Sequence, residues 1–110
     1  MEKPMPLSGI NVLDFSQIIA GPSGSMLLAD LGANVTKIES PKGELSRSIG
    51  GELNPDGLSA TFLTFNRNKK SIALDLKKEK AVEIVNELIQ RNDVLIESFK
   101  PGVMKSFKLD

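Results

Sequence analysis

The chain has 110 residues, which is enough for one domain with a modest core. Its 14 basic and 14 acidic residues give a net charge of zero, so no general affinity for nucleic acid or an anionic membrane is expected. Cysteine and histidine are both absent, which excludes a disulfide framework, a thiolate metal site and acid–base chemistry by imidazole. No apolar run approaches the roughly 20 residues that span a bilayer, and residues 1–9 lack the apolar core of a signal peptide, so we expect a cytoplasmic protein.

Residues 9–39 predict a strand, a helix and a second strand. The apolar run at 9–15 indicates a strand covered on both faces, as parallel strands usually are. Pro22 suits the first position of a helix, and Gly32 can adopt the left-handed conformation that ends one. The apolar residues between them occupy more than one stripe, so we expect this helix to be largely buried. The run at 34–39 then returns beside the first strand through a right-handed crossover.

Residues 40–58 lose all periodicity and contain several glycines and prolines, which predicts an irregular loop within the domain. A loop of this length is either functional or a structureless excursion. After it, Leu58, Phe62 and Phe65 recur at helical spacing around Ser59, a suitable N-cap, and predict a short helix.

The remaining residues alternate between strands and helices. Strands are predicted at 71–76 and 94–97. Apolar residues at i, i+3, i+4 and i+7 predict an amphipathic helix over 78–91. Pro101 is expected to open a last helix that reaches about residue 107.

This order of elements predicts an α/β fold with an open, mostly parallel, Rossmann-like doubly wound sheet. No strand follows the last predicted helix, so we expect the sheet to be incomplete. In such sheets, ligands bind outside the carboxyl ends of the strands, where the strand order reverses. If the first and fourth strands are neighbours, the loops at 16–21 and 98–100 face one crevice.

The loop after the first strand carries little of a dinucleotide-binding fingerprint. Only G-x-x-G remains, at Gly21 and Gly24, and Pro22 lacks the N–H that a phosphate cradle would use. Glu39 ends the second strand, where a ribose-binding acid is expected, but a glutamate at a strand end is usually just solvated. A nicotinamide-dependent dehydrogenase is therefore retained only as an alternative.

The other charged residues do not specify a reaction. Arg67, Lys69 and Lys70 could meet phosphates, although a solvated turn is the simpler explanation, and Asp75 could point to solvent. The sequence contains no Ser/His/Asp set, no metal-ligand cluster and no phosphate-loop motif, so we expect no metal site. The residues alone thus support an α/β domain with a cleft at its switch point.

Three segments resemble a known family. In this order and spacing, LSGINVLDFSQIIAGPSGSMLLADLGANVTKIESP, NRNKKSIALDLK and DVLIESFKPGVMKSFKL are similar to the N-terminal part of the class III CoA-transferases. That family includes formyl-CoA:oxalate and carnitine CoA-transferases and the related alpha-methylacyl-CoA racemases. The resemblance implies that residues 1–110 are an N-terminal CoA-binding α/β segment, about the first quarter of a larger enzyme.

By this resemblance, the segment serves the CoA half of the substrate. The loop after the first strand would lie near the thioester and pantetheine, and the ends of the third and fourth strands would line the CoA site. Coenzyme A or acyl-CoA is then a substrate, and no tightly bound cofactor is expected. The residues implied are Ile19, Ala20, Leu74, Asp75, Leu76, Lys77, Ser98, Phe99, Lys100, Lys105 and Ser106.

The chain departs from the family pattern at three of its positions. Ser40 and Ser106 stand where family members commonly place arginines that contact CoA. An arginine binds a phosphate through two hydrogen bonds, whereas a nearby lysine offers only a point charge. Lys42, Lys100 or Lys105 could compensate. Ile19 stands where the oxalate-type transferases carry a glutamine, which disfavours a small dicarboxylate acceptor.

No catalytic residue is assigned in this chain. The transferases use an aspartate that forms covalent intermediates, and the racemases use a histidine and an aspartate; by resemblance, all of these lie beyond Asp110. The resemblance implies an enzyme that moves CoA between carboxylic acids through an acyl-enzyme intermediate, acting as an intertwined homodimer, with the fragment alone inactive. The alternatives are a 2-methylacyl-CoA racemase and a non-catalytic CoA-binding or interaction module.

Overall fold

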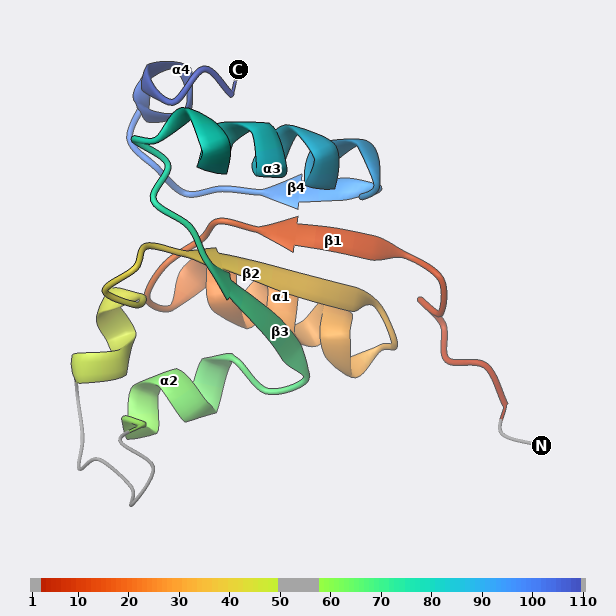
Figure 1. The fold of residues 1–110 in the computed structure, drawn as a ribbon. Helices are drawn as coiled ribbons and strands as arrows, with labels where there is room; N and C mark the ends of the chain where they lie inside the picture. Colours follow the sequence, from red (N-terminus) through yellow and green to blue (C-terminus); the bar gives the residue numbers. More distant parts are fainter. Residues whose placement is uncertain (1–2, 50–57, 110) are drawn as a thin grey trace.

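The computed structural model describes residues 3–49 and 58–109 (Figure 1). The elements in chain order are β1 (Asn11–Asp14), α1 (Ala20–Asp30), β2 (Asn34–Glu39), the 3-10 helix η1 (Leu45–Ser48), α2 (Ala60–Phe65), β3 (Lys69–Ala73), α3 (Glu79–Gln90), β4 (Val94–Ile96) and α4 (Val103–Ser106). Among the residues described, no helix is both long and apolar enough to cross a bilayer.

The four strands form one parallel sheet in the order β3-β2-β1-β4. Val12 pairs with Val35 of β2 on one side and with Val94 of β4 on the other. The strand order therefore reverses between β1 and β4, as the predicted Rossmann-like fold requires. All four carboxyl ends lie at the same edge of the sheet (Figure 1).

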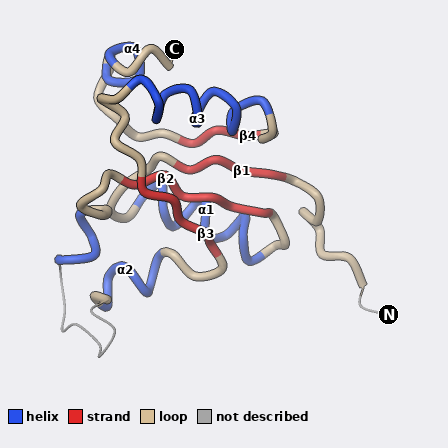
Figure 2. Tube along the Cα trace, in the orientation of Figure 1, coloured by secondary structure: helices blue, strands red, loops and turns tan. Residues whose placement is uncertain are grey.

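Helices cover both faces of the sheet, with α1 and α2 on one side and α3 and α4 on the other (Figure 2). Val12 packs with Ala29 of α1 and Val35, whereas Leu13 packs with Val85 of α3 and Ile38. Successive residues of β1 thus enter two different cores. The prediction that this strand is covered on both faces is confirmed.

Helix α1 ends as predicted but is less buried than expected. Gly32 has φ +105, and its N–H and that of Ala33 bind the carbonyls of Ala29 and Leu28, which closes the helix with a Schellman motif. Leu27 and Leu31, however, are 59% and 45% exposed, so the prediction of a largely buried helix is wrong. The helix packs on the sheet with one side only, and leucines four residues apart share the opposite side.

Pro22 is the third residue of α1 and not the first. The first four N–H groups of a helix lack intrahelical partners, so a proline at this position still removes no helical hydrogen bond.

The third strand lies earlier in the chain than predicted. Lys69 and Lys70, expected in a turn, belong to β3, and the sheet pairing stops at Ala73 because β2 ends opposite it at Glu39. Residues 74–76 therefore lie beyond the strand, in the connection to α3. This displacement places them at the carboxyl edge of the sheet, where they are free to line a cavity.

The predicted irregular segment contains one short element. The 3-10 helix η1 begins after Glu44, whose carboxylate accepts the Ser46 N–H, while residues 50–57 lie outside the described part of the chain. The predicted helix after Ser59 is confirmed as α2, and the Ser59 hydroxyl accepts the Phe62 N–H.

The last helix is shorter than predicted. Gly102 has φ +89, so the helix begins only after this left-handed residue and Pro101 remains outside it.

Candidate functional site

A cavity of about 150 Å³ lies at the carboxyl ends of the strands. Its wall is mostly apolar, and every strand end contributes to it: Phe15, Gln17, Ile38, Glu39, Ser40, Leu74, Asp75, Leu76, Lys77, Phe99 and Phe107. The rings of Phe15 and Phe99 have centroids 6.5 Å apart, and those of Phe99 and Phe107 are 6.2 Å apart. The ends of β1 and β4 therefore meet in one crevice, as the expected strand order predicts.

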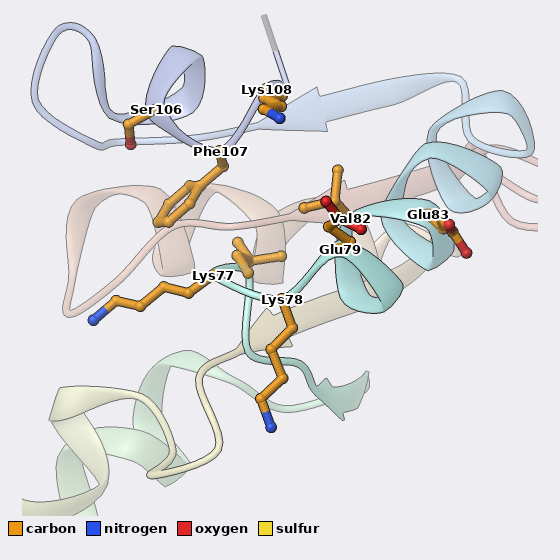
Figure 3. Close-up of a pocket in the computed structure, with 9 residues that line it drawn as sticks. Lys77, Lys78, Glu79, Val82, Glu83, Ser106, Phe107 and Lys108 are labelled. Carbon is orange, nitrogen blue, oxygen red and sulfur yellow. The ribbon is translucent and has the colours of Figure 1, made fainter.

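A second, larger hollow of about 660 Å³ adjoins the first, because Leu76, Lys77 and Phe107 line both. Figure 3 shows Phe107 beside the connection between β3 and α3, with the side chains of Lys77 and Lys78 extending outward in different directions. The remaining lining residues are Glu79, Val82, Glu83, Ser106 and Lys108. The smaller hollow is mostly apolar, whereas the larger one is lined mainly by polar and charged side chains, with three lysines and two glutamates among them. Together they suit a long ligand that is apolar in one part and charged in another.

The residues implied by resemblance fall into two groups. Six of them line one or both hollows: Leu74, Asp75, Leu76, Lys77, Phe99 and Ser106. The other five are exposed and line neither: Ile19, Ala20, Ser98, Lys100 and Lys105. The loop after β1 reaches the smaller hollow through Gln17 instead.

Asp75 shapes the connection that lines both hollows. One of its carboxylate oxygens accepts the Lys77 N–H at 3.1 Å, and its carbonyl accepts the Lys78 N–H at 3.0 Å. The Asp75 side chain is half-buried and caps this turn. Its orientation is therefore determined by these local hydrogen bonds and not only by its access to solvent.

The loop after β1 is held in a fixed shape. Ile18 has φ +71, a left-handed conformation that is a clear outlier for a β-branched residue. Lys37 Nζ donates to the Ser16 carbonyl at 2.9 Å, and the Glu44 carboxylate accepts the Ile18 N–H. Gly21 is required by close approach, since a Cβ there would lie 2.2 Å from the Ser16 Cβ.

Beneath this loop, Asp14 is fully buried in a polar cluster. Its carboxylate accepts the Ser16 N–H and the hydroxyls of Ser16 and Ser25, and Lys69 Nζ lies 3.3 Å away. Burial alone would raise the pKa of Asp14, but these hydrogen bonds and the nearby ammonium lower it below its usual value.

Lys69 is not part of a solvated turn, because its side chain is only 2% exposed. Its ammonium also donates to the Pro22 carbonyl and the Asn66 side chain, each at 2.9 Å. Burial lowers the pKa of Lys69, and Asp14 only partly offsets this effect. Arg67 is also occupied, since its guanidinium pairs with Asp30 of α1 at 2.7 Å.

Glu39 is buried and paired, so the expectation of a solvated strand end is wrong. Arg47 donates to both of its oxygens at 2.7 Å, and the Glu44 N–H and the Ser71 hydroxyl donate as well. Burial alone would raise the pKa of Glu39, but these donors lower it to about 2. A carboxylate this saturated has no capacity left for a ribose, which argues against a dinucleotide site.

Sequence reasoning missed the buried charges Lys37, Glu44 and Lys69. A usable signal existed for Lys37: it alternates with the apolar Val35 in β2, which places both on the face toward α1. Glu44 follows a glycine in an aperiodic segment, and nothing in its local pattern predicts burial. Among the described residues, no group of three or more acidic side chains could hold a metal ion.

An open parallel α/β sheet with a mostly apolar hollow at the carboxyl ends of its strands defines a ligand-binding domain of the doubly wound class. Comparison with known proteins places it more narrowly. The chain belongs to CoA-transferase family III, whose family model matches residues 7–110.

The curated relatives are longer CoA-transferases. The chain is 47% identical over 98 residues to a formyl-CoA:oxalate CoA-transferase of Streptomyces coelicolor, covering 89% of this chain and 24% of that protein. It is 43% identical over 106 residues to a succinyl-CoA:glutarate CoA-transferase of Mus musculus, covering 94% of this chain and 24% of that protein. The chain therefore spans about a quarter of the length of the relatives it matches.

Solved structures agree with this assignment. A CAIB/BAIF family protein from Brucella suis superposes with a TM-score of 0.92 at 39% identity, over 98% of this chain and 29% of that one. A mutant of Rv3272 from Mycobacterium tuberculosis superposes with a TM-score of 0.89 at 41% identity, over 99% of this chain and 29% of that one. Both curated relatives named above are CoA-transferases.

Proposed function

We propose that the full-length protein moves CoA between carboxylic acids through an acyl-enzyme intermediate, and that residues 1–110 supply its CoA-binding segment. The observation that carries this proposal is the family match over residues 7–110 in a fold whose strand ends enclose a mostly apolar hollow. The covalent aspartate of such a reaction belongs to the part of the enzyme beyond this segment. The substrates are then an acyl-CoA and a free carboxylic acid, and neither nucleic acid nor a membrane is a partner.

The hollows suit the two ends of CoA differently. The smaller one, which Phe15, Leu74 and Phe99 help to line, is mostly apolar and has a volume of about 150 Å³, which fits part of a pantetheine arm. Lys77, on the boundary of both hollows, and Lys108, on the margin of the larger one, offer ammonium groups for phosphates. Lys100 and Lys105 are exposed nearby in sequence and add charge on the α4 side.

Ser40 and Ser106 line the smaller and larger hollow, respectively. Both therefore lie beside the proposed CoA site, where arginine is common in the family. We infer that CoA binds here through lysine point charges, with more salt sensitivity than a bidentate arginine contact would give. Location in the cytoplasm and an intertwined homodimer complete the proposal.

The test uses the full-length enzyme with a panel of acyl-CoA donors and carboxylic acid acceptors, read by mass spectrometry of the acyl-CoA products. Transfer that leaves a hydroxylamine-sensitive acyl group on the protein supports the proposal. Solvent deuterium appearing at the α-carbon without transfer indicates a racemase, and CoA binding without turnover indicates a non-catalytic module; either result overturns it.

A binding measurement addresses the segment itself. Lys77→Ala should weaken CoA binding about tenfold by isothermal titration calorimetry, because it removes a phosphate-directed charge. Lys80→Ala, an exposed lysine of α3 that lines neither hollow, is the matched control and should leave the dissociation constant unchanged. Equal effects of the two changes would place CoA elsewhere.

A further inference from the structure

The backbone of the loop after β1 is strained and tied down at two points. Ile18 has φ +71, which is costly for a β-branched side chain and persists only where the surroundings impose it. Two buried charged groups hydrogen-bond to the two peptide groups that precede the strained N–Cα bond. Lys37 binds the Ser16 carbonyl at 2.9 Å, and Glu44 accepts the Ile18 N–H.

The two anchoring residues are themselves fixed by other elements. Lys37 belongs to β2 and is 1% exposed, and Glu44 precedes η1 and is 4% exposed. The second oxygen of Glu44 accepts the Ser46 N–H at 3.2 Å and the Ser46 hydroxyl, while its own N–H donates to Glu39 at 2.7 Å. The anchors are therefore part of the interior and cannot follow the loop if it moves.

Segment 39–47 is held in turn by Arg47. Its guanidinium pairs with both oxygens of Glu39 and lies over the Phe62 ring, 3.8 Å from the centroid. A continuous series of contacts thus joins α2, η1 and the end of β2 to the loop after β1.

The other side of this loop faces outward at the candidate site. Gln17 lines the smaller hollow, and the side chains of Ile18 and Ile19 are exposed. Burying two charges to hold a strained backbone costs stability that an ordinary loop would not require. This loss of stability is explained if ligand binding or reaction requires this particular conformation of the loop.

We propose that Glu44 and Lys37 are positioning residues, which hold residues 16–18 in the conformation in which Gln17 lines the smaller hollow, beside the reacting acyl-CoA. This inference rests on the proposed CoA-transferase function. Glu44 fixes the N–H of the strained residue and Lys37 fixes the carbonyl two residues earlier, so that neither peptide group can rotate during turnover. Neither side chain needs to touch the substrate.

A double-mutant cycle in the full-length enzyme tests this role. Glu44→Ala should lower kcat about 30-fold while changing KM for acyl-CoA less than about threefold, because misplacement by about 1 Å costs rate more than binding. Glycine adopts positive φ without steric cost, so in an Ile18→Gly background the same change should cost less than about fivefold. Lys37→Met should lower kcat in the same sense. Glu87→Ala, an exposed glutamate of α3, should change kcat less than about twofold.

Equal losses from Glu44→Ala in the two backgrounds would overturn the proposal, since a general structural role predicts additivity. Hydrogen exchange on the unmutated full-length enzyme gives a second test that needs neither activity nor a variant. The Ile18 amide should exchange at least about tenfold more slowly than the Gln17 amide, for which no hydrogen bond to the described residues is seen. Similar rates would overturn the anchoring itself. A full-length enzyme without CoA transfer would reject the proposed function, whereas the exchange result would still decide whether the loop is anchored.

Discussion

Replacing Glu39 with glutamine isolates the charge of a buried carboxylate that accepts four hydrogen bonds. Arg47, Ser71 and the Glu44 amide lower its pKa from 4.5 to about 2. At about 1.4 kcal/mol per pH unit, this interval corresponds to about 3 kcal/mol of stability carried by the ionised form. Glutamine has the size of the protonated acid, so Glu39→Gln should lower the free energy of unfolding at pH 7 by about that amount.

The sign of the pH dependence follows from the lowered pKa. The stabilisation is fully present above pH 4.5 and is lost as the pH falls toward about 2, where the folded protein takes up the proton. The difference between the unmutated protein and Glu39→Gln should therefore shrink as the pH falls below 4.5. Urea unfolding followed by far-ultraviolet circular dichroism measures it, since these 110 residues contain no Trp or Tyr.

A matched variant makes this measurement specific. Glu87→Gln, on the exposed side of α3, should change the free energy of unfolding at pH 7 by less than about 0.5 kcal/mol. A Glu39→Gln difference below about 0.5 kcal/mol at pH 7, or one that stays constant on acidification, would refute the claim that the Arg47 pair stabilises the fold.

Three further predictions test other contacts by the same unfolding measurement. Lys69→Met should lower the free energy of unfolding by about 3 kcal/mol, because the Asp14 carboxylate stays buried without its cation and keeps only its other donors. An unchanged free energy of unfolding would mean that this ion pair contributes nothing. Gly21→Ala should lower the free energy of unfolding by about 2 kcal/mol, because the new methyl group would overlap with the Ser16 side chain. Gly24→Ala has open space around its new methyl group and should be neutral or stabilising. Equal effects of the two changes would contradict the close approach at Gly21. Ser59→Ala should cost about 1 kcal/mol through loss of the α2 cap, and no loss would show that the cap is dispensable.

Most of the fold could be predicted because periodicity and turn chemistry agree along the chain. The spacing in residues 78–91 predicts α3, Ser59 predicts the start of α2, and Gly32 predicts the end of α1. Parallel strands linked by short crossovers then leave few topologies, and the strand order follows with β1 beside β4.

The site was only partly predictable, because it depends on where sheet pairing stops. Residues 74–76 look like strand by composition, yet β2 ends at Glu39 and offers them no further partner. Burial of Lys69 depends on a carboxylate 55 residues earlier, and single-sequence patterns carry no information about such a pair. Of the residues implied by resemblance, Leu74 and Phe99 line a hollow, whereas Ile19 does not. CoA contact at any of these positions stays a prediction.

The two sides of the sheet have cores of opposite character. Toward α3 the interior is made of interchangeable aliphatic and aromatic side chains such as Leu13 and Val85, and cores of that kind accept volume-conserving exchanges with little loss. Toward α1, near the carboxyl ends, Asp14, Glu39 and Lys37 are buried among hydroxyls and cations that must match atom for atom. Substitutions should therefore accumulate one at a time on the first side and in compensating pairs on the second, so a library of variants has more freedom around α3 than around η1.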